Sequence, residues 1–148
     1  MQNNPEIEQI LESAVDIAHA QKHEYVITEH VLLALIRHET FRRVLEKFGV
    51  EVTLFDQELL SYINSLTSMA KDPATQPKKT NALERVFNRA LTQVLFTGRR
   101  QVSTIDLMVA MLAETNSHAH YFLMKYGIKK QEFVEFWRRF VWFLATGQ

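Results

Sequence analysis

The chain has 148 residues, of which 47% are hydrophobic and 23% charged, with no cysteine and a formal net charge of zero. This length predicts one domain that buries its own core, and the absence of cysteine excludes disulfide staples and thiolate chemistry. The first residues show no basic segment followed by an apolar one, and no apolar run approaches the ~20 residues of a membrane span. We therefore expect neither a signal peptide nor a membrane helix.

Charge is divided unevenly along the chain. Residues 1–70 hold five Lys or Arg against eleven Asp or Glu, a balance of −6, and residues 71–148 hold twelve against six, a balance of +6. Such asymmetry can orient a partner or attract the two halves to each other. Ordinary solvated helix faces are the simpler explanation of the same pattern.

Apolar residues recur at spacings of three and four, which predicts amphipathic helices. The predicted helices cover residues 5–22, 29–38, 40–48, 52–67, 81–97, 105–115, 118–126 and 130–145. The stretch from Met69 to Thr80 (MAKDPATQPKKT) holds two prolines and many polar residues, which indicates a loop. No segment shows the alternation that is typical of a strand.

The predicted helices form a tandem repeat. A constant offset in numbering pairs Ala14 with Ala90 and Thr28 with Thr104, and after a two-residue insertion the turn at Gly49 matches the turn at Gly127. The threonines suit helix N-caps, and the glycines suit the left-handed residue that follows a helix. The sequence therefore predicts an all-α fold of two pseudo-twofold repeats of four helices packed as one domain, with repeat one at about 5–68, a linker at about 69–80 and repeat two at about 81–145.

The stretch from His23 to His30 (HEYVITEH) is the main candidate site. Its spacing is not the HExxH of a zinc protease, but the two histidines could still converge with Glu24 or Glu29 around a metal. Alternatively the stretch forms a docking surface, and Glu29 suits the first turn of a helix, where negative charge is favourable. At the repeat offset the second repeat carries Arg99, Arg100, Ile105 and Asp106. The fold therefore does not require the set of acids and histidines.

Enzyme and nucleic-acid chemistry find little support. The chain contains no GxxxxGK[ST], GxGxxG or GxSxG motif. Six basic residues could form a stripe for nucleic acid, although a net charge of zero argues against it. They are Lys78, Lys79, Arg85, Arg89, Arg99 and Arg100.

Aromatic residues occupy more than one face of the last predicted helix. They are Phe133, Phe136, Trp137, Phe140, Trp142 and Phe143. We expect most of them to pack in the core and between the repeats, and some to be exposed on a surface for a partner.

The repeat resembles the Clp amino-terminal domain, the N-domain of the AAA+ unfoldases that feed the ClpP protease, and is most similar to its ClpA branch. The residues that carry the resemblance are Lys22 to Ile36 (KHEYVITEHVLLALI), the Gly49-Val50 turn, the Ala74-Thr75-Gln76-Pro77 linker and Leu83 to Arg99 (LERVFNRALTQVLFTGR). The resemblance covers nearly the whole chain. It implies a non-catalytic cytoplasmic domain that receives adaptors and protein substrates for degradation above an ATPase ring.

In ClpA-like domains the partner is the small adaptor ClpS, and the resemblance places the adaptor contacts at Glu24, Glu29, Thr80 and Arg85. It also implies that His23 and Glu29 could hold incidental zinc, with no other cofactor, no nucleic acid and no membrane. ClpC-like relatives bind phosphoarginine through an acid in each repeat, which is not expected here because Ile105 replaces the second acid.

The resemblance leaves open what surrounds this domain. The chain could be the N-domain of a longer Clp unfoldase that works with ClpP. It could also be a free-standing copy that acts as a decoy or an accessory subunit of the ring. A helical protein that binds a metal or a nucleic acid is the alternative from a different functional class.

Overall fold

The structure, a computed structural model, describes residues 4–72 and 74–146. Over these residues the chain forms eight helices and two short strands. In chain order they are α1 (Pro5–Ala20), β1 (Tyr25–Val26), α2 (Thr28–Arg37), α3 (Glu39–Phe48), α4 (Val52–Asn64), β2 (Lys78–Lys79), α5 (Asn81–Phe96), α6 (Thr104–Ala113), α7 (His118–Lys125) and α8 (Lys130–Thr146).

The helices repeat at the spacing that the sequence predicts. The first residues of α1 and α5 are separated by the same offset as the first residues of α2 and α6. α8 begins slightly further along than this offset from α4, which agrees with the two-residue insertion. The prediction of an all-α fold built from two four-helix repeats is confirmed.

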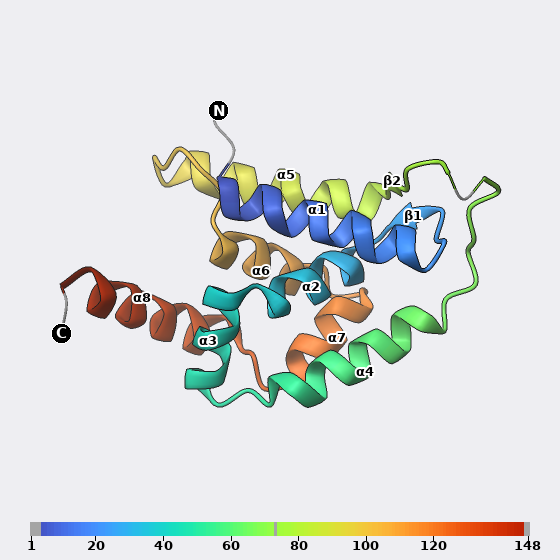
Figure 1. The fold of residues 1–148 in the computed structure, drawn as a ribbon. Helices are drawn as coiled ribbons and strands as arrows, with labels where there is room; N and C mark the ends of the chain where they lie inside the picture. The colour runs from blue at the N-terminus through green and yellow to red at the C-terminus, as the bar shows by residue number, and fades with distance from the viewer. Residues whose placement is uncertain (1–3, 73, 147–148) are drawn as a thin grey trace.

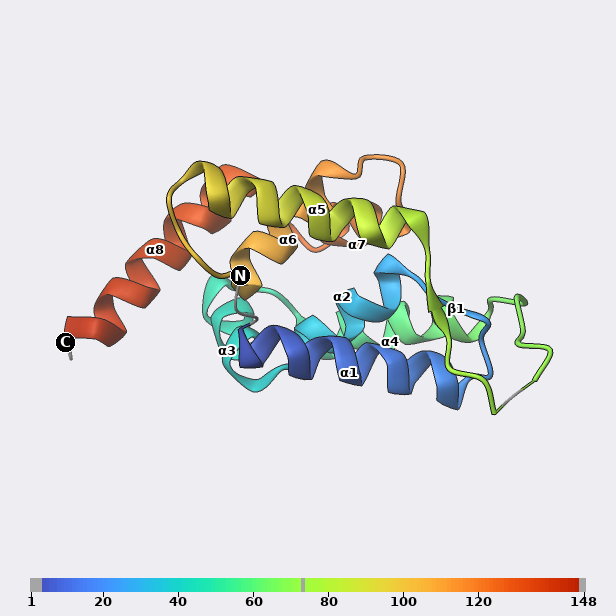
Figure 2. The same ribbon diagram turned by 90° about the horizontal axis from the view of Figure 1, so that it is seen from above.

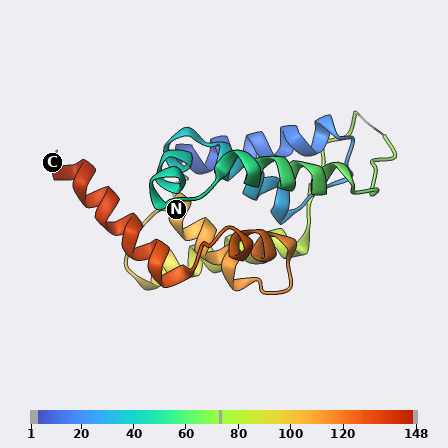
Figure 3. The same cartoon turned by 90° about the horizontal axis from the view of Figure 1, so that it is seen from below.

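The two central helices, α2 and α6, are buried along nearly their whole length. α1 packs on α2, and α5 packs on α6, so that these two long helices lie along one side of the molecule (Figures 1 and 2). α4 and α7 cover the opposite side, and α8 leads away from the body beside α3 (Figure 3). α2 also contacts α5, α6 and α7, so the two repeats share one core. No helix within the described residues is long and apolar enough to cross a membrane.

The linker contains a strand that the sequence did not reveal. β2 pairs in parallel with β1, with Tyr25 opposite Lys78. On the other side of the same loop, His23 forms an antiparallel bridge with Met69. Pairs this short have no room for alternating side chains, which explains why no pattern predicted them. The linker is therefore paired with the loop between α1 and α2 at two places, once before and once after Glu24.

The helix bounds differ from the predicted ones by up to three residues, the largest difference being at the C-terminus of α4, which ends at Asn64 instead of residue 67. Gly49 and Gly127 have φ angles of 103° and 79° and end α3 and α7 in left-handed turns, as predicted. The predicted N-caps Thr28 and Thr104 are instead the first residues of α2 and α6. The caps lie one residue earlier because side chains in the first turn accept hydrogen bonds from residues 27 and 103.

Candidate functional site

Two buried histidines hold the loop between α1 and α2. Nδ1 of His30 accepts the backbone N–H of Ile27 over 2.9 Å, and Nε2 of His30 lies 3.0 Å from Nδ1 of His23. The first bond leaves only Nε2 of His30 to carry the proton of a neutral ring, so this nitrogen donates to His23. His23 then carries its own proton on Nε2, which is buried and has no hydrogen-bond partner among the described residues. We call this contact the histidine bridge.

Burial keeps the histidine bridge neutral near pH 7. It lowers the pKa of His30 to about 4, with a smaller contribution from the neighbouring His23. Burial also lowers the pKa of His23, and the backbone of Leu66 opposes this effect, although Nε2 forms no regular hydrogen bond within the described chain. A proton added to either ring would bring a desolvated charge and would turn the accepting nitrogen of that ring into a donor that faces another N–H.

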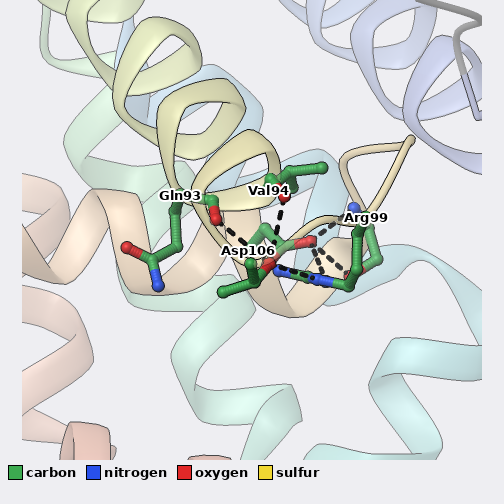
Figure 4. Close-up of polar contacts among 6 residues, drawn as sticks. Gln93, Val94, Arg99 and Asp106 are labelled. Carbon is green, nitrogen blue, oxygen red and sulfur yellow. Dashed lines mark hydrogen bonds and ion pairs between the residues drawn. The ribbon is translucent and has the colours of Figure 1, made fainter.

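The second repeat builds the equivalent contact from charged side chains (Figure 4). Nη1 and Nη2 of Arg99 donate to Oδ2 and Oδ1 of Asp106 over 2.9 and 2.5 Å. Oδ2 of Asp106 also accepts the backbone N–H of Ser103 over 2.8 Å, in the same way as His30 accepts that of Ile27. Each loop thus joins the end of one helix to the first turn of the next. We call this second contact the charged bridge.

The end of α5 fixes the guanidinium before it reaches Asp106 (Figure 4). The hydroxyl of Thr97 donates to the carbonyl oxygens of Gln93 and Val94 over 3.1 and 3.0 Å. The same hydroxyl accepts Nε of Arg99 over 3.0 Å. Thr97 therefore limits the conformations that the long arginine side chain can adopt.

α1 and α5 end in the same left-handed turn, which aims the two bridges. Gly98 has a φ of 77° after α5, and Lys22 occupies the equivalent place after α1 with a φ of 60°. The next residue, Arg99 or His23, donates its backbone N–H to the carbonyl five residues earlier, as in a Schellman motif. This geometry turns both side chains toward the helix that follows.

Glu29 faces the other repeat rather than solvent. Glu29 is only 7% exposed. Its Oε2 accepts the backbone N–H of Ala119, in the first turn of α7, over 2.8 Å. Burial raises the pKa of Glu29, whereas the bond to Ala119 and the nearby His118 lower it. The carboxylate satisfies a free N–H at the positive end of α7 and so links the two repeats.

Glu24 and Thr80 lie together where the loop of repeat one meets the linker. The N–H of Lys78 donates to the carbonyl of Glu24 over 3.1 Å, and that of Thr80 donates to the carbonyl of Val26 over 3.2 Å. Oγ1 of Thr80 accepts the N–H of Leu83 over 3.2 Å and caps α5. The half-buried Glu24 makes no side-chain ion pair within the part of the chain that the structure describes.

Arg85 lies on α5, five residues after Thr80. Its Nε is 3.4 Å from Oε1 of Glu114, and Nη2 of Arg89 lies 3.6 Å from the same oxygen. The Arg85 side chain is 59% exposed, and exposed pairs of this kind contribute at most about 1 kcal/mol to stability. Arg85 therefore keeps most of its donors available to a partner.

The predicted zinc ligands are engaged in separate contacts. His23 bonds to His30, whereas Glu29 bonds to Ala119 on α7. Among residues 4–72 and 74–146, no group of three or more His, Asp or Glu side chains is placed to hold a metal ion. The arrangement therefore gives the zinc hypothesis no support.

Sequence reasoning placed the bridge residues at equivalent positions but missed what they do. The repeat offset already pairs His23 with Arg99 and His30 with Asp106. An imidazole pair and an arginine–aspartate pair can both span the same gap with hydrogen bonds. This shared capacity is the signal that could have revealed the two bridges.

The fold defines a class of helical domain in which two four-helix repeats share one core and each repeat ties its first two helices together with a polar bridge. The family model for the Clp repeat (R) N-terminal domain matches residues 3–126. The chain belongs to this family and is a Clp N-domain.

Similar proteins agree with this assignment. The ClpA homolog protein of Fuscovulum blasticum is 31% identical over 132 residues, which cover 88% of this chain and 17% of that protein. The Hsp104 N-terminal domain of Candida albicans matches with a TM-score of 0.78 and 13% identity, covering 92% of this chain and 89% of that one. A ClpV N-domain in complex with a VipB peptide matches with a TM-score of 0.66 and 19% identity, covering 86% of this chain and 79% of that one.

Proposed function

We propose that this domain docks a small adaptor protein of the ClpS type through a surface formed by Glu24, Tyr25, Lys78, Thr80 and Arg85. Through this adaptor it would deliver protein substrates to a Clp ATPase ring that works with ClpP in the cytoplasm. The proposed role is docking without catalysis. The chain spans 17% of the ClpA homolog that it resembles, so the ring and its protease are part of the proposal.

The pairing of β1 with β2 is the observation that carries this proposal. It joins Glu24 in the loop of repeat one to Thr80 at the start of α5, although the two are far apart in sequence. The resulting docking surface draws on the first repeat, the linker and the second repeat. It lies at the end of the molecule opposite α8 (Figure 1).

The charges of the docking surface suit a polar, specific contact. Glu24 offers a carboxylate without an ion pair among the described residues, Lys78 is exposed, and Arg85 offers a guanidinium with free donors. Tyr25, which pairs with Lys78, is 39% exposed and adds apolar area to the surface. Charges at the rim of an interface mainly orient the partner, and an exposed aromatic residue supplies apolar surface that the partner can bury.

Two of the predicted contact residues act less directly than the resemblance implies. Glu29 is buried against α7, so we propose that it supports the docking surface by fixing repeat one on repeat two. The hydroxyl of Thr80 already caps α5 and its backbone already bonds to Val26 and Glu84, so we propose that Thr80 shapes the docking surface rather than bonding to the partner. Glu24 and Arg85 carry the contact in this proposal.

Calorimetric titration with a ClpS-like adaptor tests the proposal. We expect Glu24→Lys and Arg85→Ala each to weaken binding about tenfold or more, with thermal melts unchanged. Arg89→Ala is the matched control, because it removes the other pair to Glu114 but lies a further turn along α5. Wild-type protein that fails to bind the adaptor, or variants that bind it normally, would contradict the proposal.

A further inference from the structure

The last helix, α8, runs beyond the surface on which it packs (Figures 1 and 3). Its inner part packs on the core through Trp137 and Phe140, and the Trp137 ring lies 5.6 Å from that of Phe41. Leu144 continues this stripe at the next helical position but is 60% exposed, and Trp142 is 61% exposed. The last part of α8, residues 138–146, which we call the protruding end, therefore contacts the core through Phe140 but leaves the apolar side chains of Val141, Trp142 and Leu144 exposed.

A groove of about 620 Å³ lies between α1 and the junction of α2 with α3. Ile10, Ile17 and Ala34 line its inner, more buried part, and Glu12 and Asp16 line its exposed edge. Neither Glu12 nor Asp16 makes an ion pair within residues 4–72 and 74–146. The groove thus combines apolar surface with two unpaired negative charges.

The basic side chains that line this groove do not pair with those two carboxylates. Arg37 makes a two-pronged pair with Asp56 at 2.7 and 2.9 Å, and Nε2 of His38 lies 2.9 Å from Glu6. Both are therefore already engaged with other acids. The groove remains electronegative and favours a ligand that brings its own positive charge.

The protruding end of α8 complements the groove in charge, hydropathy and length. Arg138, Val141 and Trp142 share one helical face, and Arg138 makes no ion pair within the described part of the chain. The groove runs along α1 from Gln9 to Ile17, about 12 Å at 1.5 Å per residue, and the protruding end spans a similar length. Amphipathic helices commonly bind in grooves of this kind.

We propose that the protruding end of α8 from a second copy of this chain occupies the groove, so that the domain self-associates. The partner's Arg138 faces Glu12 and Asp16, while the partner's Trp142 covers the apolar floor. The opposite charges of the two repeats, −6 and +6, favour this arrangement between identical chains. α3 contacts α8 and also lines the groove, so each of two copies can place its protruding end in the groove of the other around a twofold axis.

Sedimentation equilibrium with paired charge reversals tests this proposal. We expect the average molecular mass of the wild-type protein to rise with concentration to twice that of the monomer. The double variants Glu12→Lys/Asp16→Lys and Arg138→Glu/Arg139→Glu should each associate more weakly, by about tenfold or more. An equimolar mixture of the two variants should restore association, because both contacts then join opposite charges again. Glu8→Lys, on the same helix but outside the groove, should behave as wild type.

A second variant separates apolar contact from charge. Trp142→Ala should also weaken association about tenfold, because it removes the largest exposed side chain without changing the net charge. A wild-type protein that stays monomeric at about 1 mM, or variants that fail to reassociate on mixing, would overturn the proposal. So would a monomer whose tryptophan fluorescence shifts with phosphatidylglycerol vesicles, which would assign α8 to a lipid surface.

Discussion

The loops that join the first two helices of each repeat, residues 21–27 and 97–103, meet one structural requirement with different chemistry. In repeat one, the neutral His23 and His30 share a hydrogen bond. In repeat two, Arg99 and Asp106 form a two-pronged ion pair at the same positions. Both repeats therefore bridge these positions, and the chemistry of the bridge differs with the surroundings.

The surroundings explain which chemistry each loop uses. The linker pairs with the first loop at His23 and again at Tyr25 and Val26, and His23 is only 4% exposed. The side chain of Arg99 is 44% exposed, so its charge stays in contact with water. A desolvated guanidinium would be costly in the enclosed loop, and a neutral pair avoids that cost. Each bridge therefore suits the exposure of its own loop.

Lowering the pH should give the largest difference between the two bridges in their contribution to the free energy of unfolding. The pKa of His30 falls from 6.5 to about 4 on folding, so between these values the unfolded chain binds more protons than the folded one. The free energy of unfolding should therefore drop as the pH falls through this window, by about 3 kcal/mol for His30. Above pH 6.5 the contribution of His30 is complete and constant. Urea unfolding at a series of pH values measures this dependence.

The double change His23→Arg and His30→Asp is the matched control for the acid experiment. It places the charged bridge in the enclosed loop, so the loss of stability between pH 6.5 and 4 should largely disappear. Stability at pH 7 should decrease, because the loop leaves little water around the guanidinium. Glu29, whose raised pKa makes folding more favourable as the pH falls, is present in both proteins and cancels. An unchanged slope would mean that other groups titrate.

Breaking the charged bridge from its exposed side should have the next largest effect. Arg99→Ala leaves the carboxylate of Asp106 in a residue that is 7% exposed, with only the bonds from Ser103 to satisfy it. We expect a loss of about 2 kcal/mol in the free energy of unfolding, below the range for fully buried pairs because Arg99 is partly exposed. Arg100→Ala changes an exposed neighbour and should stay within about 0.5 kcal/mol. Equal losses in both variants would contradict the prediction.

Replacing Glu29 by the residue of the other repeat tests the contact between the repeats. Glu29→Ile introduces the counterpart Ile105 and leaves the N–H of Ala119 without its acceptor, at a cost of about 1 kcal/mol. Glu29→Gln keeps an acceptor oxygen and removes a buried charge, so its change should be smaller than that of isoleucine. Chemical denaturation of both variants at pH 7 measures the difference. A glutamine variant as unstable as the isoleucine one would show that the charge itself matters.

The smallest expected effect concerns the left-handed turn after α1. Lys22 has a φ of 60°, where the second repeat uses Gly98. Lys22→Gly should relieve strain of about 1 kcal/mol and lose part of this gain to the greater entropy of the unfolded chain. We expect a net stabilisation of about 0.5 kcal/mol in thermal or urea unfolding. The reverse change, Gly98→Lys, should destabilise, and two changes of the same sign would break the equivalence of the turns.

The helices and the register of the repeat were predictable because they depend on local periodicity. Apolar spacing places every helix to within a few residues, and Gly49 and Gly127 mark turns that a side chain would disfavour. The N-caps were placed one residue late, because a propensity for threonine says nothing about His30 and Asp106 reaching back. Local sequence therefore predicts the elements better than the contacts that begin and end them.

The candidate site was predictable only in part, because its geometry depends on residues far apart in the chain. Glu24 and Thr80 were expected in one docking surface from the resemblance, and the structure brings their backbones together. The burial of Glu29 could not be read from its neighbours, because its partner Ala119 lies 90 residues away. The zinc hypothesis came from the spacing of His23 and Glu29 and from the resemblance, and the structure turns these two side chains to different partners.

The hydrogen bonds between the linker and the first loop affect which insertions this domain can tolerate. The linker is hydrogen-bonded to residues 22–24 on one flank and to residues 24–26 on the other. The linker residues that make these bonds are Ser68 and Ala70 at one end and Lys78 and Thr80 at the other. The length of the linker between Ala70 and Lys78 can therefore vary without moving Glu24 relative to Thr80. Doubling such a loop costs only about 0.6 kcal/mol in closure entropy. The domain can thus accept insertions there, including an introduced reporter, and still present the same docking surface.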